Sequence, residues 1–277
     1  MAKENQKKII DIRKIIHEKA PKLEGKIPSF IINYLIRIVH QNEINKILHN
    51  LHGKEGITAM TELFKYFDIR LNIHGTEKLL HQERYIFASN HPLGGLDGIC
   101  LSYVIGNIYN GNVRLPVNDL LLFLPQLRQI FIPVNKHGRQ DRQTVELTDQ
   151  AYSSDNQIIT FPAGLCSRKI KGVITDTEWK KSFIQKAIDY KRSVVPVHFD
   201  GKNSNFFYNL ASFRKKLGIK LNLEMLYLAD ELFKSKSSVF NIYFGDPIPH
   251  TLFDKSRTIP QWAQWVKSKS YSLKNQQ

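Results

Sequence analysis

Residues 84–108 read RYIFASNHPLGGLDGICLSYVIGNI. The apolar start predicts a strand over 84–89, and the apolar residues that follow the glycine-rich turn predict a helix over 97–108. His91 stands directly after the strand, and Asp97 stands six positions later. Gly94 and Gly95 permit backbone angles that fold the acid back toward the histidine. His91 and Asp97 are therefore candidates for a general base and the carboxylate that orients it.

Two further segments also pass from a buried strand into polar residues: IITFPAGLCSRK (158–169) and SVVPVHFDGKNS (193–204). The carboxyl ends of parallel strands lie along one edge of a sheet, which is the usual place for a site. The alternation of elements predicts an α/β fold with a mixed, largely parallel sheet flanked by helices on both faces. The expected strands cover 69–74, 84–89, 113–117, 129–134, 157–161, 193–199 and 238–244, and the expected helices cover 56–67, 97–108, 140–153, 177–190 and 222–233.

The first part of the chain, residues 1–55, is expected to form an amphipathic helical region ahead of an α/β domain over 56–277. Its apolar residues recur at helical spacing in three stripes, with basic residues between them. Such helices either dock in a lipid interface with their cations at the head groups or pack on the α/β core. Both alternatives stay open here, and the same two apply to Trp262 and Trp265 near the C-terminus.

Composition excludes several classes of protein. No run of about 18 apolar residues is present, so no transmembrane helix is expected, and the charged first residues do not resemble a signal peptide. Two cysteines, Cys100 and Cys166, are too few for a disulfide framework or a metal site and suit a reducing cytoplasm. Neither a metal nor a cofactor is expected.

The net charge of +15 predicts an anionic partner. Nucleic acid, an anionic membrane surface and an acidic protein or cofactor are the candidates. The sequence holds no zinc-finger spacing, helix-turn-helix signature or aromatic RNA-binding block. We therefore expect a membrane surface and no nucleic acid.

The motifs, taken in order, resemble those of the phospholipid/glycerol acyltransferases, which include the lysophosphatidic acid acyltransferases. Proteins of that family carry an asparagine, a histidine and an aspartate, then an FPEGTRS block, then a Val/Ile-Pro-Val/Ile block. The matching stretches here are Asn90-His91 with Asp97, FPAG (161–164) with Ser167-Arg168, and VPV (195–197). IFIPVNK (130–136) stands in the place of the family's second block. The resemblance covers roughly residues 65–250.

Two departures from the family pattern are informative. Five residues separate His91 from Asp97, whereas the family usually has four. In this motif the sequence resembles the bacterial branches of the family that are called hemolysin-like. Ala163 replaces the glutamate that the family associates with the acceptor head group, which puts a glycerol-phosphate acceptor in doubt. The branch that the chain resembles includes enzymes that acylate lyso-amino-acid lipids built on glycine or ornithine.

The resemblance implies a peripheral enzyme on the cytoplasmic face of the inner membrane, acting in membrane lipid biosynthesis. It would transfer a fatty acyl group from acyl-ACP or acyl-CoA to the hydroxyl of a lyso-lipid, with His91 and Asp97 as the catalytic pair. Backbone amides near Gly164, or after Pro92, are candidates to bind the oxyanion. The expected substrate-binding residues are Asn90, Gly94, Gly95, Lys136, Arg139, Pro162, Gly164, Ser167 and Arg168.

Several alternatives remain. The acceptor could be 1-acylglycerol-3-phosphate, or water in a hydrolase. The chain could also be a basic membrane- or nucleic-acid-binding protein without catalysis. A thiol nucleophile at Cys166 ranks below the histidine mechanism, because that mechanism needs no covalent step. His198 and Asp200 form a second histidine–acid pair at a strand end and rank below His91 and Asp97.

Overall fold

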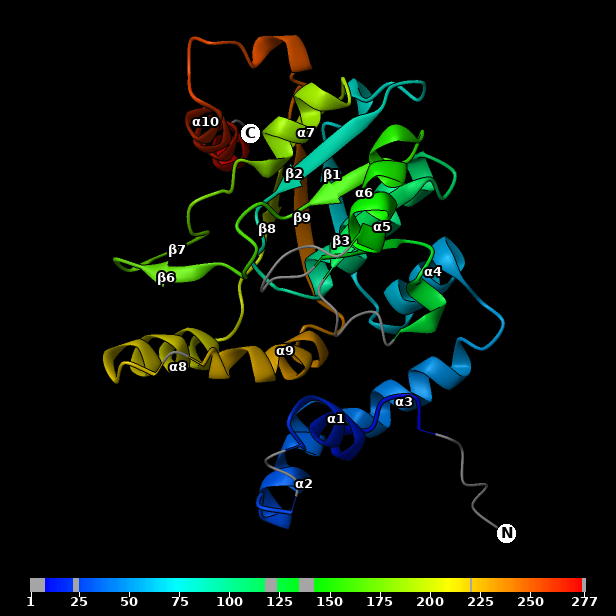
Figure 1. Cartoon of the computed structure of the whole chain (residues 1–277), viewed down its shortest axis with the longest axis vertical. Coiled ribbons are helices and arrows are strands. Elements are labelled where there is room, and N and C mark those ends of the chain that lie inside the picture. The colour runs from blue at the N-terminus through cyan, green and yellow to red at the C-terminus, as the bar shows by residue number, and fades with distance from the viewer. Residues whose placement is uncertain (1–7, 22–24, 118–123, 135–141, 220, 276–277) are drawn as a thin grey trace.

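A seven-stranded sheet with the order β1-β9-β8-β2-β5-β3-β4 organises the part of the chain that the computed structural model describes, residues 8–21, 25–117, 124–134, 142–219 and 221–275 (Figure 1). Neighbouring strands are parallel except β8 and β9, which are antiparallel. The prediction of a mixed, largely parallel sheet is confirmed. The strands are β1 (Arg70–His74), β2 (Tyr85–Ser89), β3 (Val113–Val117), β4 (Phe131–Pro133), β5 (Gln157–Thr160), β8 (Ser193–Asp200) and β9 (Val239–Phe244).

Helices cover both faces of this sheet, as the alternation predicts. One apolar cluster joins α4 and α5 to one face, and a second joins α6, α7 and α10 to the other. The helices are α1 (Ile12–Lys19), α2 (Ser29–Ile38), α3 (Gln41–Asn50), α4 (Gly56–Tyr66), α5 (Leu96–Ile108), α6 (Arg142–Ser153), α7 (Ser182–Asp189), α8 (Asn205–Lys216), α9 (Leu228–Lys234) and α10 (Ile259–Ser272), with a 3-10 helix, η5 (Leu223–Tyr227), before α9.

Strand β2 lies in the interior of the sheet and ends at the candidate site. Its side chains alternate between the two clusters, since Phe87 enters one and Ile86 and Ala88 enter the other. Each large side chain buried in this way contributes about 1.5–3 kcal/mol. The strand is therefore held on both faces, and the residue that follows it starts from a fixed position.

Helix α8 and a small hairpin of β6 (Arg168–Ile170) and β7 (Val173–Thr175) lie outside the ranges expected from the sequence. Helix α8 is rich in Phe, Tyr and Asn, which are weak helix formers, and it depends on tertiary contacts. Ser204 caps it, and Arg214 pairs with Glu224 ten residues away. In the hairpin, Lys171 and Gly172 both have positive φ angles, as a tight two-residue turn requires.

The N-terminal helices α2 and α3 both contact the rest of the molecule. On α3, Ile47 and Leu48 are buried in the core, so the packing alternative describes this helix. On α2, the Tyr34 hydroxyl lies 2.6 Å from the Tyr227 hydroxyl of η5, while Phe30 stays 73% exposed. The proposed division at residue 55 remains a prediction.

Packing also describes the C-terminal helix. Trp262 is buried in the cluster between α10 and the sheet, and Trp265 is packed against it. None of the described helices combines the length and apolar character needed to cross a bilayer.

Candidate active site

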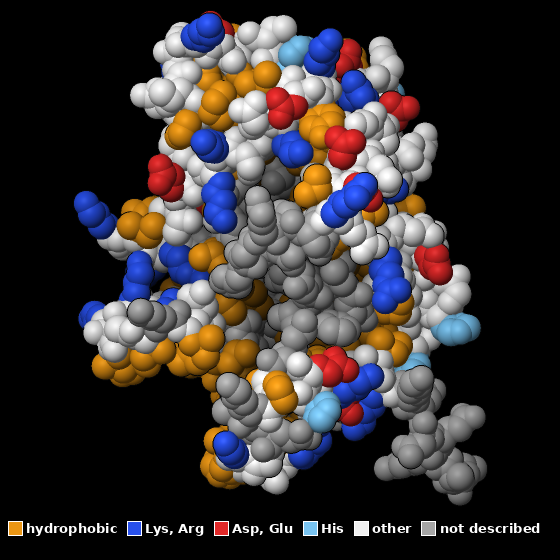
Figure 2. Space-filling view, in the orientation of Figure 1, with side chains coloured by type: hydrophobic (Ala, Val, Ile, Leu, Met, Phe, Trp, Pro, Cys, Tyr) orange, Lys and Arg blue, Asp and Glu red, His pale blue; other side chains and the backbone are white. Residues whose placement is uncertain are grey.

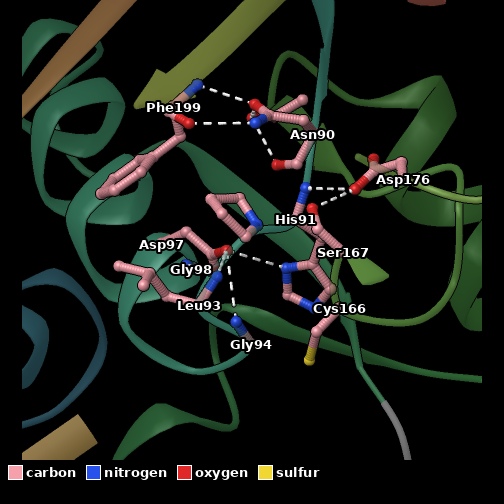
Figure 3. A network of polar contacts seen from close by, with 12 residues as sticks. Asn90, His91, Leu93, Gly94, Asp97, Gly98, Cys166, Ser167, Asp176 and Phe199 are labelled. Atoms are coloured by element: carbon pink, nitrogen blue, oxygen red, sulfur yellow. Dashed lines mark hydrogen bonds and ion pairs between the residues drawn. The ribbon is translucent and has the colours of Figure 1, made fainter. Parts of the chain in front are cut away.

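His91 lies just beyond the carboxyl end of β2, where the backbone leaves the sheet (Figure 3). Its ring faces the Asp97 carboxylate across the glycine turn, with Nδ1 3.1 Å from Asp97 Oδ2. The side chain of His91 is 17% exposed, whereas Asp97 is fully buried. When the carboxylate accepts the Nδ1 proton, Nε2 is left to take a proton from another group, which is the arrangement of a general base and its orienting acid.

Asp97 is held by backbone donors as well as by the histidine. It is the second residue of α5, and its Oδ1 accepts the N–H of Gly98 at 2.9 Å. Its Oδ2 accepts the N–H groups of Leu93 at 2.9 Å and Gly94 at 3.3 Å. The first turn of a helix favours a negative charge, and these donors fix both carboxylate oxygens. The amides after Pro92, which we expected to bind an oxyanion, are thus occupied by this carboxylate.

The glycines of the turn differ in what surrounds them. Gly94 has a φ of +83°, and a methyl group there would lie 2.9 Å from both Cys166 Sγ and Leu228 Cδ2. Gly95 has a φ of −85° and stands before α5 with open space where a methyl group would be. The tight turn therefore requires glycine at 94 but not at 95.

Phe161 carries the FPAG block to the histidine from the end of β5. Its ring stacks on the His91 imidazole with 4.0 Å between the centroids. Pro162 is buried, and its carbonyl accepts the N–H of Lys180 at 3.0 Å. The N–H of Gly164 donates to the Phe161 carbonyl at 2.9 Å. The block therefore meets the imidazole through the stacked Phe161 ring, and substrate contacts by Pro162 and Gly164 stay predictions.

Ser167 joins the histidine through a buried carboxylate, Asp176, that sequence reasoning missed. The Ser167 N–H donates to the His91 carbonyl at 2.7 Å, and its hydroxyl donates to Asp176 Oδ1 at 2.6 Å. The same oxygen accepts the His91 N–H at 3.3 Å, and Oδ2 accepts Trp179 Nε1–H at 2.9 Å. Asp176 therefore fixes the backbone of His91 from the side opposite to Asp97 (Figure 3).

Helix α10 in turn positions Asp176. The Asp176 N–H donates to the Tyr271 hydroxyl at 2.7 Å, and Lys267 Nζ donates to the Asp176 carbonyl at 2.7 Å. No local pattern in the sequence links these residues, because Asp176 is 91 positions from Lys267 and 95 positions from Tyr271. Only the folded chain brings them together.

Asn90 links two strands. Its Nδ2 donates to the Phe199 carbonyl at 2.9 Å, and its Oδ1 accepts the Phe199 N–H at 2.7 Å. The amide therefore completes the contact between the end of β2 and β8 and is buried there. A direct contact between Asn90 and substrate stays a prediction, and the observed role of the side chain is to anchor the start of the histidine loop.

Of the expected cations, only Arg168 lies among the described residues, and its partner is a buried carboxylate. Arg168 directs its guanidinium to the buried Glu224, with 3.1 Å between Nη2 and Oε1, and Arg214 binds the other oxygen of the same carboxylate at 2.8 Å. Because two guanidinium groups share one carboxylate, the cluster keeps a positive charge. Lys136 and Arg139 lie outside the described residues, so their assignment stays a prediction.

The thiols are buried. Cys166 is 1% exposed and Cys100 is fully buried. Burial, and then the Asp97 carboxylate, raises the pKa of the Cys100 thiol well above its usual value, which keeps it protonated. Within the described part of the chain no three His, Cys, Asp or Glu side chains gather in a way that would hold a metal ion.

The second histidine–acid pair has a different character. His198 is buried in β8, and burial lowers its pKa to about 4. Its ring packs edge-on against Tyr271, and Nδ1 has no hydrogen-bond partner among the described residues. Asp200 pairs instead with Lys274 at 2.8 Å. A neutral imidazole held apart from its neighbouring acid does not reproduce the geometry of His91 and Asp97.

Comparisons with known proteins found sequences that are similar over almost the whole chain. A family model described as acyltransferase matches residues 14–277. A lyso-glycine lipid O-acyltransferase of Bacteroides thetaiotaomicron is 49% identical over 265 residues, covering 96% of this chain and 97% of that protein. A lyso-glycine lipid O-acyltransferase of Phocaeicola vulgatus is also 49% identical over 265 residues, covering 96% of this chain and 95% of that protein.

Among solved structures, the 1-acyl-sn-glycerophosphate (LPA) acyltransferase PlsC of Thermotoga maritima matches with a TM-score of 0.46 and 15% identity, over 96% of this chain and 99% of that one. The resemblance that the histidine, FPAG and VPV motifs indicate is confirmed by the family model and by the two relatives that match almost end to end. The chain is an enzyme and belongs to the acyltransferase family.

Proposed function

We propose that this protein transfers a fatty acyl group from an acyl thioester to the hydroxyl of a lyso-lipid, and that the acceptor is a lyso-glycine lipid. The observation that carries the proposal is the His91–Asp97 pair, in which a buried carboxylate 3.1 Å from Nδ1 orients the imidazole. The two relatives named as lyso-glycine lipid O-acyltransferases support the choice of acceptor.

The reaction follows from this pair. His91 Nε2 removes the proton of the acceptor hydroxyl while the oxygen attacks the thioester carbonyl carbon, and Asp97 stabilises the imidazolium that forms. The tetrahedral intermediate collapses with cleavage of the carbon–sulfur bond, and the imidazolium returns the proton to the leaving thiolate. General-base assistance of this kind contributes about 10²–10⁴-fold to the rate.

The choice between acceptors centres on Ala163. This residue is buried against the second core cluster and carries no charge. An amino-acid lipid does not require an acidic side chain there, whereas the related block with glutamate is associated with a glycerol-phosphate acceptor. The second candidate, 1-acylglycerol-3-phosphate, is favoured by the order of the sequence blocks and is tested beside the first.

The donor and the place of action complete the proposal. A net charge of +15 suits an acidic acyl carrier protein, the phosphates of coenzyme A and an anionic membrane surface. We assign the protein to the cytoplasmic face of the cell membrane as a peripheral enzyme. Neither a metal nor a bound cofactor enters the proposed reaction.

The test is an acyl-transfer assay with a monoacyl glycine lipid, a monoacyl ornithine lipid and lysophosphatidic acid, each with acyl-ACP and with acyl-CoA. We expect a diacyl product from the glycine acceptor, and we expect His91→Ala to abolish it while its melting curve and vesicle binding persist. Transfer to lysophosphatidic acid alone would assign the second candidate. Release of free fatty acid without a diacyl product would indicate a hydrolase, and full activity of His91→Ala would remove the proposed base.

A further inference from the structure

Helix α8 has a large apolar stripe on its outer side. Phe206, Leu210, Phe213 and Leu217 recur at helical spacing, and Phe213 and Leu217 are 60% and 58% exposed. A surface helix of a globular protein normally turns its apolar stripe toward the core. The stripe of α8 therefore requires a partner that the described chain does not supply.

The inner side of α8 explains why the stripe faces outward. Arg214 is buried and reaches both oxygens of the fully buried Glu224, at 2.8 and 3.1 Å. Arg168 binds the same carboxylate at 3.1 Å. Removing one member of such a buried cluster leaves an uncompensated charge, which is costly. These ion pairs therefore lock the rotation of the helix and hold its apolar residues at the surface.

Helix α2 and the segment after α8 extend the apolar area. Phe30 on α2 is 73% exposed, and Leu221 beyond α8 is 69% exposed. The contact between the hydroxyls of Tyr34 and Tyr227, at 2.6 Å, ties α2 to η5. Figure 2 shows hydrophobic side chains gathered along the outer edge of α8 and on the outer side of α2. The α2–α8 surface, as we call it, consists of Phe30, Ile31, Phe206, Phe213, Leu217 and Leu221.

Charge indicates what covers this surface. Neither α2 nor α8 contains an acidic residue, and Lys215 and Lys216 end α8 beside the stripe. Apolar side chains flanked by cations without acids suit a bilayer that contains anionic lipids, because the apolar residues enter the acyl region and the cations meet the head groups. We infer that the α2–α8 surface docks on an anionic lipid bilayer, which deepens the proposed function and rests on it.

The same segment reaches the catalytic loop. Asn203, just before α8, donates from Nδ2 to the Pro92 carbonyl at 3.2 Å. Phe207, on the inner side of α8, packs with Cys166 in a small apolar cluster. A helix is about 10 Å across. Docking through the outer side of α8 therefore places the bilayer roughly one helix diameter from the histidine loop, which suits an acceptor that is itself a membrane lipid.

The test compares two double variants with the same change of charge. Phe213→Glu with Leu217→Glu alters the α2–α8 surface, and Leu80→Glu with Val145→Glu alters two other residues that are 52% and 53% exposed. Flotation is measured with vesicles of phosphatidylglycerol and phosphatidylethanolamine and with vesicles of phosphatidylcholine alone. We expect the first variant to bind anionic vesicles about tenfold or more weakly than the wild type, since two large apolar side chains leave the lipid, and the second to bind nearly as the wild type does.

Each outcome decides the inference. Equal binding of anionic vesicles by the first variant and the wild type would overturn the inference. Equal losses of vesicle binding in the two variants would also overturn it, because net charge alone would then explain the binding. A wild-type dimer that becomes monomeric in the first variant, with vesicle binding unchanged, would assign the surface to a second copy of the chain. Acyl transfer to acceptor dispersed in detergent micelles should persist in both variants. A wild type without transfer would contradict the proposed function separately, whatever the vesicle result.

Discussion

Replacing Asp97 with asparagine keeps the size of the side chain but removes its charge and one acceptor oxygen. The substitution therefore tests whether the carboxylate orients His91. The carboxylate accepts four hydrogen bonds, three at Oδ2 and one at Oδ1. An asparagine amide has a single acceptor oxygen. If that oxygen replaces Oδ2, the amide NH₂ faces the N–H of Gly98. If the NH₂ replaces Oδ2, it faces two backbone donors, and His91 can bond to it only through an unprotonated Nδ1.

In either arrangement the imidazolium that forms loses the negative charge that stabilises it. The second arrangement also leaves the proton on Nε2, where it prevents the imidazole from acting as a base. We therefore expect Asp97→Asn to lower kcat by about 10²–10⁴-fold, which is the contribution of general-base assistance. This corresponds to roughly 2.7–5.4 kcal/mol of activation free energy. A buried donor without its acceptor also costs about 1–3 kcal/mol of folding stability in either arrangement.

The assay is steady-state acyl transfer to the monoacyl glycine lipid, at a temperature well below the melting midpoint of the variant. Asp200→Asn is the matched control, because it makes the same exchange at the other histidine–acid pair, where the acid is partly exposed and bound to Lys274. We expect this control to keep wild-type kcat. A folded Asp97→Asn variant with kcat within a few-fold of the wild type would refute the assignment of Asp97 as the orienting acid.

Three further predictions follow from the packing. Gly94→Ala should lower both stability and kcat, since its methyl group would press on neighbouring side chains at 2.9 Å with φ at +83°, whereas Gly95→Ala should melt as the wild type does. Asp176→Asn should lower kcat by about tenfold and stability by about 1–3 kcal/mol because one buried donor loses its acceptor, measured by kinetics and thermal denaturation. Because burial lowers the pKa of His198 to about 4, the unfolded chain binds a proton that the folded chain does not as pH falls from about 6.5, so stability should fall by roughly 3 kcal/mol down to pH 4. His198→Phe should flatten that slope in denaturant titrations.

Each of these predictions has its own control or contrary result. Equal melting of the Gly94→Ala and Gly95→Ala variants would contradict the proposed clash. Asp176→Asn should lower kcat more than it changes KM, because Asp176 positions the base and does not bind the acceptor, and a change confined to KM would reject that role. His81→Gln, which removes an exposed imidazole, should keep the wild-type slope with pH, and an unchanged slope in His198→Phe would reject the buried histidine as its source.

The sheet was predictable because its strands carry their own signal. The residues around Phe87 and Val195 form short apolar runs that are too continuous for a surface strand, and the structure buries them between two helical layers. The His91–Asp97 pair was predictable for a related reason, since strand, glycine turn and helix follow one another within a few residues. Patterns within short stretches of sequence were therefore enough to predict both the core strands and the candidate base.

The parts that escaped prediction depend on contacts between distant residues. Asp176 accepts a hydrogen bond from His91, which lies 85 positions earlier in the sequence, and Arg168 donates one to Glu224, which lies 56 positions later. An arginine two residues from a buried thiol gives no local indication that a carboxylate will bind it. Helix α8 has weak helix formers and aromatic residues on both its inner and outer sides, so its periodicity did not distinguish core from surface.

The bonds between Asp176 and α10 have a consequence for protein synthesis. The Asp176 carboxylate helps to fix the candidate base, and the Asp176 backbone is itself bound by Tyr271 and Lys267. Residues 259–272 leave the ribosome long after the histidine loop has been made. A nascent chain stalled before this helix emerges would therefore lack an ordered site, and acyl transfer should begin only once the helix has been released and has docked.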